Sequence, residues 1–185
     1  MTEDIKAGDM KAGENMTGGA PQKEGRITWL DFQPLKSRYG GPELGRLYRT
    51  RPDGTREGAN ILVRLHESAL PEVEGPLRGA TFTLGGVVVS PYALDARVAR
   101  VPHVWDYRLE QTGQKEYRIR ALRDPKEDDR GLKGGILDAL VDIYGGKGRF
   151  DIEIVSDAAR LMEWPEEQGS RTRATFPVDW EELFQ

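Results

Sequence analysis

The chain has 185 residues, of which 37% are hydrophobic and 31% charged, and it carries a formal net charge of −4 and no cysteine. This length accommodates one domain with a hydrophobic core, and the lack of cysteine excludes disulfides, thiol nucleophiles and cysteine-ligated metal sites. No apolar run approaches the roughly 20 residues of a membrane-spanning helix, and the N-terminus lacks the apolar core of a signal peptide. We therefore expect a cytoplasmic protein that does not contact a membrane.

The first segment is polar and rich in glycine. Residues 1–25 contain almost no apolar side chains, which predicts a disordered leader. Order is expected to begin at the sequence RITWLDFQ, where Ile27, Trp29 and Phe32 indicate a strand. We therefore expect a single globular β-rich domain over residues 26–164, followed by a C-terminal extension over residues 165–185.

Alternating apolar and polar residues then predict two hairpins. Residues 45–51 and 59–66 form the first, joined across a Pro-Asp-Gly turn in which Gly54 can adopt the left-handed conformation. The sequence ATFTLGGVVVS predicts a further strand with a bulge or sharp bend at its two glycines. The second hairpin joins VWDYRLE to KEYRIRAL, and its alternation places Trp105, Tyr107 and Leu109 on one apolar face.

Only the last third of the chain has a helical pattern. The sequence ILDALVDIYGG has an apolar stripe with Gly145 as its C-cap, and SDAARLMEW predicts a short helix, with a strand over GRFDIEIV between them. The fold class that follows is a β-rich α+β protein. We expect a twisted antiparallel sheet or small β-barrel of about six to eight short strands, with one or two helices packed on it in the C-terminal third.

Catalytic and metal-binding motifs are not recognisable. His66 and His103 have neither a partner at helical spacing nor the acid spacing of a zinc signature, and no serine lies in a nucleophile motif. The acidic run at residues 124–129 lacks the order of a calcium loop, so a solvated loop is favoured over a cation site. We expect no cofactor and no metal, and the sequence does not favour an enzyme. An active site made of carboxylates alone remains an open alternative.

Arginine is concentrated in the first hairpin and the loop before it. Residues 34–64 contain seven Lys or Arg against three acids, whereas residues 151–185 contain three against nine. Arginine and aromatic side chains on one surface are typical of nucleic-acid binding, since the arginines contact phosphates and the aromatic rings stack on bases. The alternative is a hairpin whose charges keep a sheet edge soluble. The predicted phosphate contacts are Arg46, Arg49, Arg51 and Arg56, and the predicted stacking residues are Tyr39 and Tyr48.

The sequence VDWEELFQ at the C-terminus mixes acidic and aromatic residues, which is typical of a short motif that docks into an apolar groove on a protein partner. Over this short stretch it resembles the acidic tails of bacterial single-stranded-DNA-binding proteins, which recruit partners, although it ends in Phe-Gln rather than Pro-Phe. The alternative is that the tail packs on its own domain as a final helical turn. The residues concerned are Trp180, Glu181, Glu182, Leu183 and Phe184.

Together these patterns favour a non-enzymatic protein that binds nucleic acid, most plausibly single-stranded, with a tail for partner docking or self-regulation. The second hypothesis is a structural or assembly protein, such as a virion component or a subunit of a larger complex, without nucleic-acid binding. Both hypotheses include a protein partner or self-association.

Overall fold

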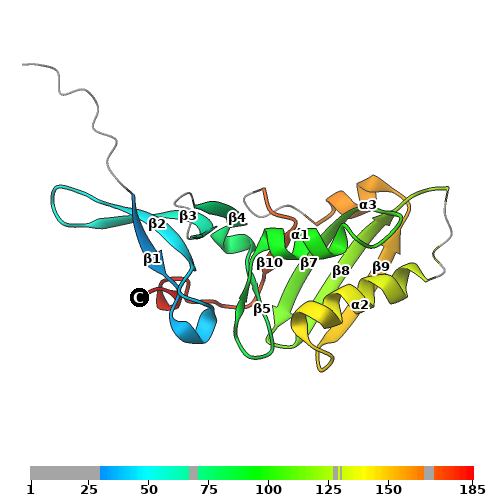
Figure 1. Cartoon of the computed structure of the whole chain (residues 1–185). Coiled ribbons are helices and arrows are strands. Elements are labelled where there is room, and N and C mark those ends of the chain that lie inside the picture. Colours follow the sequence, from blue (N-terminus) through cyan, green and yellow to red (C-terminus); the bar gives the residue numbers. More distant parts are fainter. Residues whose placement is uncertain (1–29, 67–70, 127–128, 130, 165–168) are drawn as a thin grey trace, which may run out of the picture.

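The computed structural model describes residues 30–66, 71–126, 129, 131–164 and 169–185, so the predicted leader lies outside the described residues. The described part is α+β, with several sheets and few helices. Its strands form two four-stranded sheets and one two-stranded sheet. The first sheet and the larger second sheet lie side by side along an elongated molecule, and the β2–β3 hairpin projects from one end (Figure 1).

The first sheet is antiparallel, with the strand order β1-β2-β3-β4. The predicted first hairpin is confirmed, since Arg46 of β2 pairs with Leu62 of β3. Its turn has Gly54 at a φ of 83°, and Asp53 accepts hydrogen bonds from the Thr55 amide at 2.8 Å and its hydroxyl at 2.6 Å. The strands are β1 (Asp31–Pro34), β2 (Leu44–Thr50), β3 (Arg56–Arg64) and β4 (Glu72–Pro76).

The second sheet has the order β10-β7-β8-β9 and is mixed. Strands β7 and β8 form the predicted second hairpin, whereas β9 pairs with β8, and β10 with β7, in parallel. A small hairpin of β5 and β6 connects the two large sheets along the chain. The strands are β5 (Thr81–Phe82), β6 (Val88–Val89), β7 (Val104–Gly113), β8 (Glu116–Arg123), β9 (Arg149–Val155) and β10 (Thr172–Ala174).

Three α-helices pack on the second sheet or beside it. Helix α1 (Pro91–Val98) begins with Ser90, whose hydroxyl accepts the Ala93 amide at 3.1 Å, and Pro91 occupies its first turn. Helix α2 (Leu132–Tyr144) ends as predicted at Gly145, which has a φ of 86°. Helix α3 (Ala158–Met162) is short, and Asp157 caps it. Among the described residues no helix combines the length and the apolar character needed to cross a membrane.

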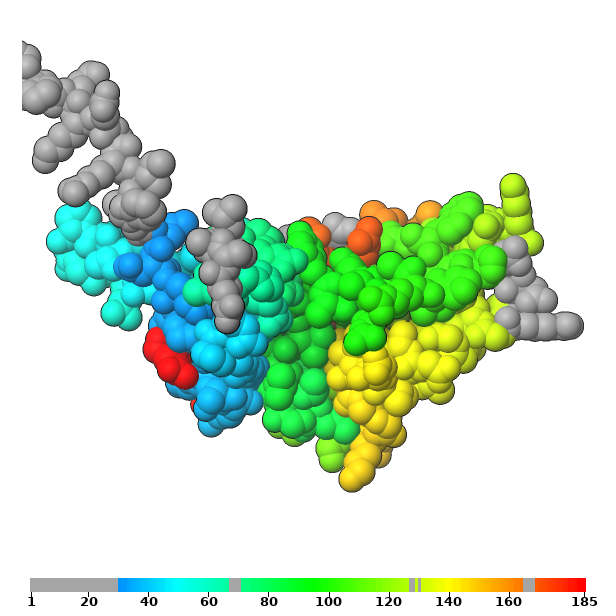
Figure 2. Space-filling view, viewed as in Figure 1, coloured from blue at the N-terminus to red at the C-terminus, as the bar shows by residue number. Residues whose placement is uncertain are grey.

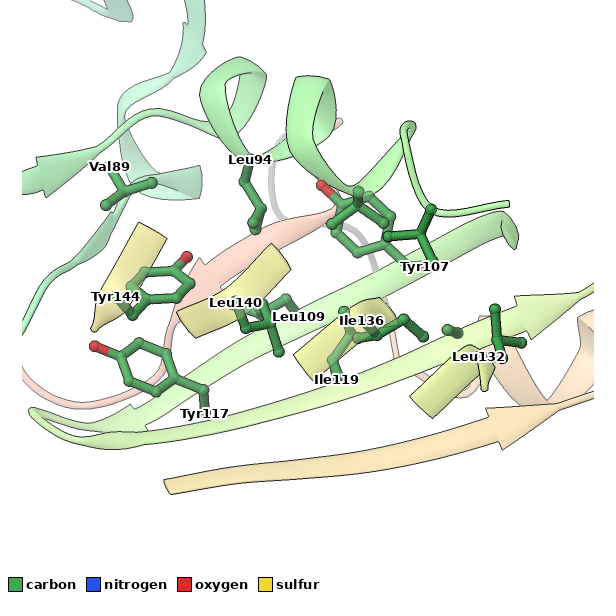
Figure 3. Packing of buried hydrophobic residues seen from close by; sticks show 13 residues of the cluster. Val89, Leu94, Tyr107, Leu109, Tyr117, Ile119, Leu132, Ile136, Leu140 and Tyr144 are labelled. Atoms are coloured by element: carbon green, nitrogen blue, oxygen red, sulfur yellow. The ribbon is translucent and has the colours of Figure 1, made fainter. Parts of the chain in front are cut away.

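Two hydrophobic clusters form the interior. In the larger, α1 and α2 cover one face of the second sheet, where Leu140 and Ile136 of α2 lie against Leu109 and Ile119 of the sheet (Figure 3). The smaller cluster joins the first sheet to the β5–β6 hairpin and the C-terminal tail. Its buried members are Leu35, Leu44, Leu62, Leu77, Ala80, Phe82, Val88, Leu183 and Phe184.

The structure corrects the sequence analysis at five points. The described strands form separate sheets and no closed barrel, and the second sheet is not purely antiparallel. The expected strand over residues 80–90 is instead two short strands around a turn, and helix α1 lies outside the last third. Trp105 does not share the buried face of Tyr107, because the β7–β8 register shifts between Val104 and Asp106, and Trp105 is 61% exposed.

Candidate functional site

The predicted phosphate contact Arg46 lies inside the protein's own contacts. Its guanidinium donates to the two carboxylate oxygens of Glu181 at 2.9 and 2.5 Å and to Gln33 at 3.0 Å, and it stacks over the Phe184 ring at 4.1 Å. The Arg46 side chain is only 11% exposed. A guanidinium held in this way by a carboxylate fork and an aromatic face has few donors left for a phosphate.

The other predicted arginines lie on the projecting hairpin, where each also has a partner in the same chain. Arg49 and Arg51 both donate to the same oxygen of Glu57, each at 3.0 Å through its terminal nitrogen, and these contacts hold the pKa of Glu57 below its ordinary value. Arg56 lies over the ring of Tyr48 at 4.9 Å. Two of these arginines therefore share one carboxylate, and the third lies against a tyrosine ring.

Tyr39 lies apart from this hairpin, at the end of the 3₁₀ turn η1 (Ser37–Tyr39). The Arg38 guanidinium covers its ring at 4.6 Å. The two predicted stacking residues, Tyr39 and Tyr48, therefore lie in different environments, and Tyr39 lines a pocket described below.

The C-terminal tail packs on the protein's own first sheet, and Figure 2 shows the last residues in red against the blue N-terminal strand region. Leu183 and Phe184 are buried, and the Lys36 amide donates to the Leu183 carbonyl at 2.8 Å. Glu182 pairs with Arg38, and Trp180 lies 6.0 Å from Phe82 between ring centroids. The docking role stays a prediction, but Leu183 and Phe184 are not accessible to a partner in this structure.

A pocket of about 390 Å³ lies where the tail meets the β5–β6 hairpin. It combines segments far apart in the sequence, and no local pattern in any of them indicated it. Its walls include three aromatic rings, from Tyr39, Phe82 and Phe176, and the turn at Gly85 and Gly86. The remaining lining residues are Thr83, Leu84, Gln114, Pro177, Val178, Asp179, Glu182 and Leu183.

Buried polar contacts fix the Phe82 wall of the pocket. The side-chain amide of Gln111, which is fully buried, accepts the Phe82 N–H at 2.7 Å and donates to the Phe82 carbonyl at 3.1 Å. The Tyr117 hydroxyl donates to the same carbonyl at 2.6 Å, and burial raises the pKa of Tyr117 to about 12, so it stays protonated at neutral pH. Phe82 is thereby attached to both β7 and β8.

The glycine turn leaves space at the pocket. Gly86 has a φ of 80°, and its amide donates to the Thr83 carbonyl at 2.9 Å. Gly85 is exposed, and among the described residues a side chain there would first meet the Thr83 hydroxyl oxygen, at 3.8 Å. Position 85, in the lining of the pocket, can therefore accept a larger side chain.

The charged groups of the pocket lining are acidic, and one of them, Glu182, pairs with Arg38. The described residues that line it include the carboxylates of Asp179 and Glu182 and no Lys, Arg or His. One oxygen of Asp179 accepts the amides of Glu181 at 3.1 Å and Glu182 at 3.2 Å. Aromatic walls with an acidic rim suit a planar, uncharged group and disfavour a buried phosphate.

No group of three or more His, Asp or Glu among the described residues has the arrangement of a metal site. Of the predicted acidic loop, residues 127 and 128 lie outside the described residues. His66 contacts Glu72 at 2.6 Å.

A separate polar cluster joins α1 to β7, where the Tyr107 hydroxyl donates to Asp95. Burial is the main cause that raises the pKa of Tyr107, and the hydrogen bond to Asp95 is the next. Arg171 bridges Asp95 and Asp106 beside it.

Comparison with known proteins gives similarity in fold only. No family model and no curated protein matches the chain. Among solved structures, an anthranilate CoA ligase in complex with anthranoyl-AMP superposes with a TM-score of 0.50 at 13% identity over 77% of this chain. An acetoacetyl-CoA synthetase from Streptomyces lividans has a TM-score of 0.50 at 14% identity over 69%. The matches cover 31% and 24% of those proteins, so the chain spans about a third of their length or less.

These findings correct the functional prediction. The structural neighbours are domains of adenylate-forming ligases, not nucleic-acid-binding or assembly proteins, so the hypothesis of a non-enzymatic single-stranded nucleic-acid binder is wrong, as is its alternative. The physical reason is visible in the hairpin. The sequence analysis treated its arginines as free to bind phosphate, whereas in the fold they contact Glu57, Glu181 and aromatic rings.

Proposed function

We propose that this chain binds an acyl-adenylate and takes part in carboxylate activation, as a domain with the fold of adenylate-forming ligases. The observation that carries the proposal is the likeness in fold to a CoA ligase whose structure contains anthranoyl-AMP. Because the chain spans only 31% of that ligase, the proposal concerns ligand binding and not the complete reaction.

The aromatic pocket is the site we propose for this ligand. Phe176 and Tyr39 are partly exposed rings on different segments of its lining, and Arg38 already covers one of them, Tyr39, at 4.6 Å. A planar base or aryl group can stack on the Phe176 ring. The described lining offers a phosphate no basic side chain, and it includes the carboxylate of Asp179, so the ring system of the ligand enters and its phosphate faces solvent.

The test is isothermal titration calorimetry of the full-length chain with a non-hydrolysable anthranoyl-sulfamoyl adenosine. We expect binding with a Kd on the order of micromolar, since a pocket of this size encloses only part of the ligand. Gly85→Leu adds a large apolar side chain to the lining of the pocket and should weaken binding at least about tenfold, equivalent to about 1.4 kcal/mol.

Gly146→Leu is the matched control. Gly146 is an exposed loop glycine whose side-chain direction meets Val141 at 3.8 Å, as position 85 meets Thr83, but it lies outside the pocket lining. This variant should bind as the wild type does. The proposal is abandoned if the analogue does not bind the wild-type chain at about millimolar concentration.

A further inference from the structure

Another pocket, of about 280 Å³, lies between helix α1 and the beginning of β7, where the Tyr107 ring packs against α1 (Figure 3). We call it the Trp105 pocket, and it shares no lining residue with the aromatic pocket. Its lining combines the aliphatic side chains of Val98 and Val104 with an indole, a phenol and three charged groups. Apolar walls with a few polar groups are typical of a site for a small molecule.

An irregular backbone at the start of β7 exposes Trp105 at this pocket. His103 has a φ of 65°, and in the described part of the chain no other residue except glycine has a positive φ. The β7–β8 register then shifts between Val104 and Asp106, and Trp105 is 61% exposed. Bulges and left-handed residues other than glycine cost free energy, and proteins use them to redirect side chains at functional sites. Here the result is an indole ring on which a ligand can stack.

Asp95 supplies the pocket with a carboxylate oxygen that can accept a hydrogen bond. Its Oδ1 atom accepts the Tyr107 hydroxyl, which fixes the orientation of the carboxylate. Its Oδ2 atom lies 3.5 Å from a terminal nitrogen of Arg171, and the side chain is 32% exposed. Because a carboxylate oxygen can accept two hydrogen bonds, Oδ2 can bind a donor from a ligand.

Arg171 supplies donors beside that oxygen. Its Nε atom donates to Asp106 at 2.7 Å, and Asp106 also accepts the Tyr107 amide at 2.8 Å and the Arg108 guanidinium at 3.2 Å. Asp106 is therefore fully engaged and holds Arg171 in place. The two terminal nitrogens of Arg171 carry four N–H groups, and its side chain is 46% exposed, so it can donate to a ligand.

The charges of this cluster favour a ligand that carries both signs. The carboxylates of Asp95 and Asp106 are balanced by the guanidinium groups of Arg171 and Arg108, so a simple anion or cation would leave one charge of the cluster opposed. A zwitterion can pair with Asp95 and Arg171 together. Since these two side chains lie only 3.5 Å apart, the two charges of the ligand must also be adjacent, as they are on the α-carbon of an amino acid.

We propose that the Trp105 pocket binds a free α-amino acid with an apolar or aromatic side chain. The α-ammonium group donates to Oδ2 of Asp95, and the α-carboxylate accepts from the terminal nitrogens of Arg171. The side chain of the amino acid lies against the Trp105 indole. This site is independent of the one proposed for the acyl-adenylate, because the two pockets have no residue in common.

The test is a titration of the ¹⁵N-labelled full-length chain with L-phenylalanine, followed by two-dimensional NMR. We expect saturable shifts that include the Trp105 indole N–H, with a Kd on the order of 1 mM. Two probes share the ring and the chain length but carry one charge each: 3-phenylpropionate lacks the ammonium group, and 2-phenylethylamine lacks the carboxylate. Each should bind at least about tenfold more weakly than L-phenylalanine, because it pairs with only one of the two charged side chains. Equal affinity of either probe overturns the proposal.

Substitutions locate the binding. Asp95→Asn keeps an acceptor for the Tyr107 hydroxyl but removes the charge, and Trp105→Ala removes the stacking surface, so each should raise the Kd for L-phenylalanine at least about tenfold. Tyr92→Ala is the matched control, since Tyr92 is an exposed aromatic residue of α1 outside the pocket lining, and its Kd should equal that of the wild type. Gly85→Leu, in the aromatic pocket, should also leave this Kd unchanged.

Two results would overturn the proposal at this stage. One is the lack of saturable binding by the wild type at about 20 mM L-phenylalanine, since a Kd above that concentration is too weak for a specific site. The other is binding that is unaffected by both Asp95→Asn and Trp105→Ala, which would place the amino acid elsewhere on the molecule.

Discussion

At the scale of single residues, Gln111 connects the two halves of the interior. Its amide satisfies both backbone groups of Phe82, which belongs to the smaller cluster, although Gln111 itself lies on β7. A buried polar side chain is tolerated when its donors and acceptors are paired, and here the pairing also positions the wall of the pocket.

Gln111→Leu should therefore destabilise the protein by about 2–3 kcal/mol, because it leaves the Phe82 N–H buried without its acceptor. Urea unfolding followed by circular dichroism measures the change. Gln114→Leu is the control, since Gln114 is exposed, and it should stay within about 0.5 kcal/mol of the wild type. Equal effects of the two substitutions would show that the buried amide has no special part in stability.

Glu57 gives a second prediction at this scale. Hydrogen bonds from Arg49, then Arg51, lower its pKa from the ordinary value of 4.5. When the pKa of a carboxyl group is lower in the folded state than in the unfolded state, its stabilisation is complete above the unfolded-state pKa and is lost as the pH falls through the folded-state pKa. The hairpin contacts should therefore persist at neutral pH and weaken only below pH 4.5.

An NMR titration of the Glu57 carboxyl carbon should place its midpoint below 4.5. Arg49→Gln removes the first partner and should raise that midpoint, and so should high salt, because the pair is exposed. A midpoint at or above the ordinary value in the wild type would contradict the arrangement of the hairpin.

At the scale of elements, the C-terminal tail is part of the fold. Strand β10 pairs with β7, and the turn η3 (Glu181–Leu183) places Phe184 in the smaller cluster, where Leu35 and Phe184 form a β-bridge. The Gln185 amide donates to the Pro34 carbonyl at 3.1 Å, so the tail closes over the first strand. Residues at the end of the chain therefore stabilise residues at the beginning of the described fold.

Phe184→Ala should destabilise the protein by about 3–4 kcal/mol, because it leaves a cavity in the smaller cluster and removes the ring on which Arg46 stacks. Trp105→Ala is a suitable control, since that ring is exposed and its loss should lower the free energy of unfolding by less than about 1 kcal/mol. Chemical denaturation distinguishes the two. If Phe184→Ala unfolds at the wild-type midpoint, the tail does not pack as described.

At the scale of the whole molecule, local sequence patterns predict individual helices and hairpins, but they do not predict the contacts between segments that are distant in the sequence. Both hairpins and α2 follow from alternation and helical periodicity, whereas the parallel pairing of Thr172 with Leu109 links distant segments that carry no mutual signal. Helix α1 has only Leu94 and Val98 as buried aliphatic markers after its initial proline, so its pattern is too short to identify. The pocket is invisible for the same reason, because η1, the Gly85 turn and the tail converge only in the folded chain.

The same connections predict cooperative unfolding. Phe82 of the smaller cluster bonds to Gln111 and Tyr117, which sit on strands of the larger one, so neither cluster can open without breaking buried hydrogen bonds of the other. Leu35→Ala in the smaller cluster and Leu140→Ala in the larger one should each lower the free energy of unfolding by about 2–5 kcal/mol. The urea midpoint should fall accordingly, and the dependence of the unfolding free energy on urea concentration should stay unchanged. Tryptophan fluorescence and far-UV circular dichroism should give coincident transitions in both variants, as expected for a two-state unit. If Leu35→Ala produces two separate transitions, the clusters belong to independently folding parts and the Phe82 contacts do not couple them.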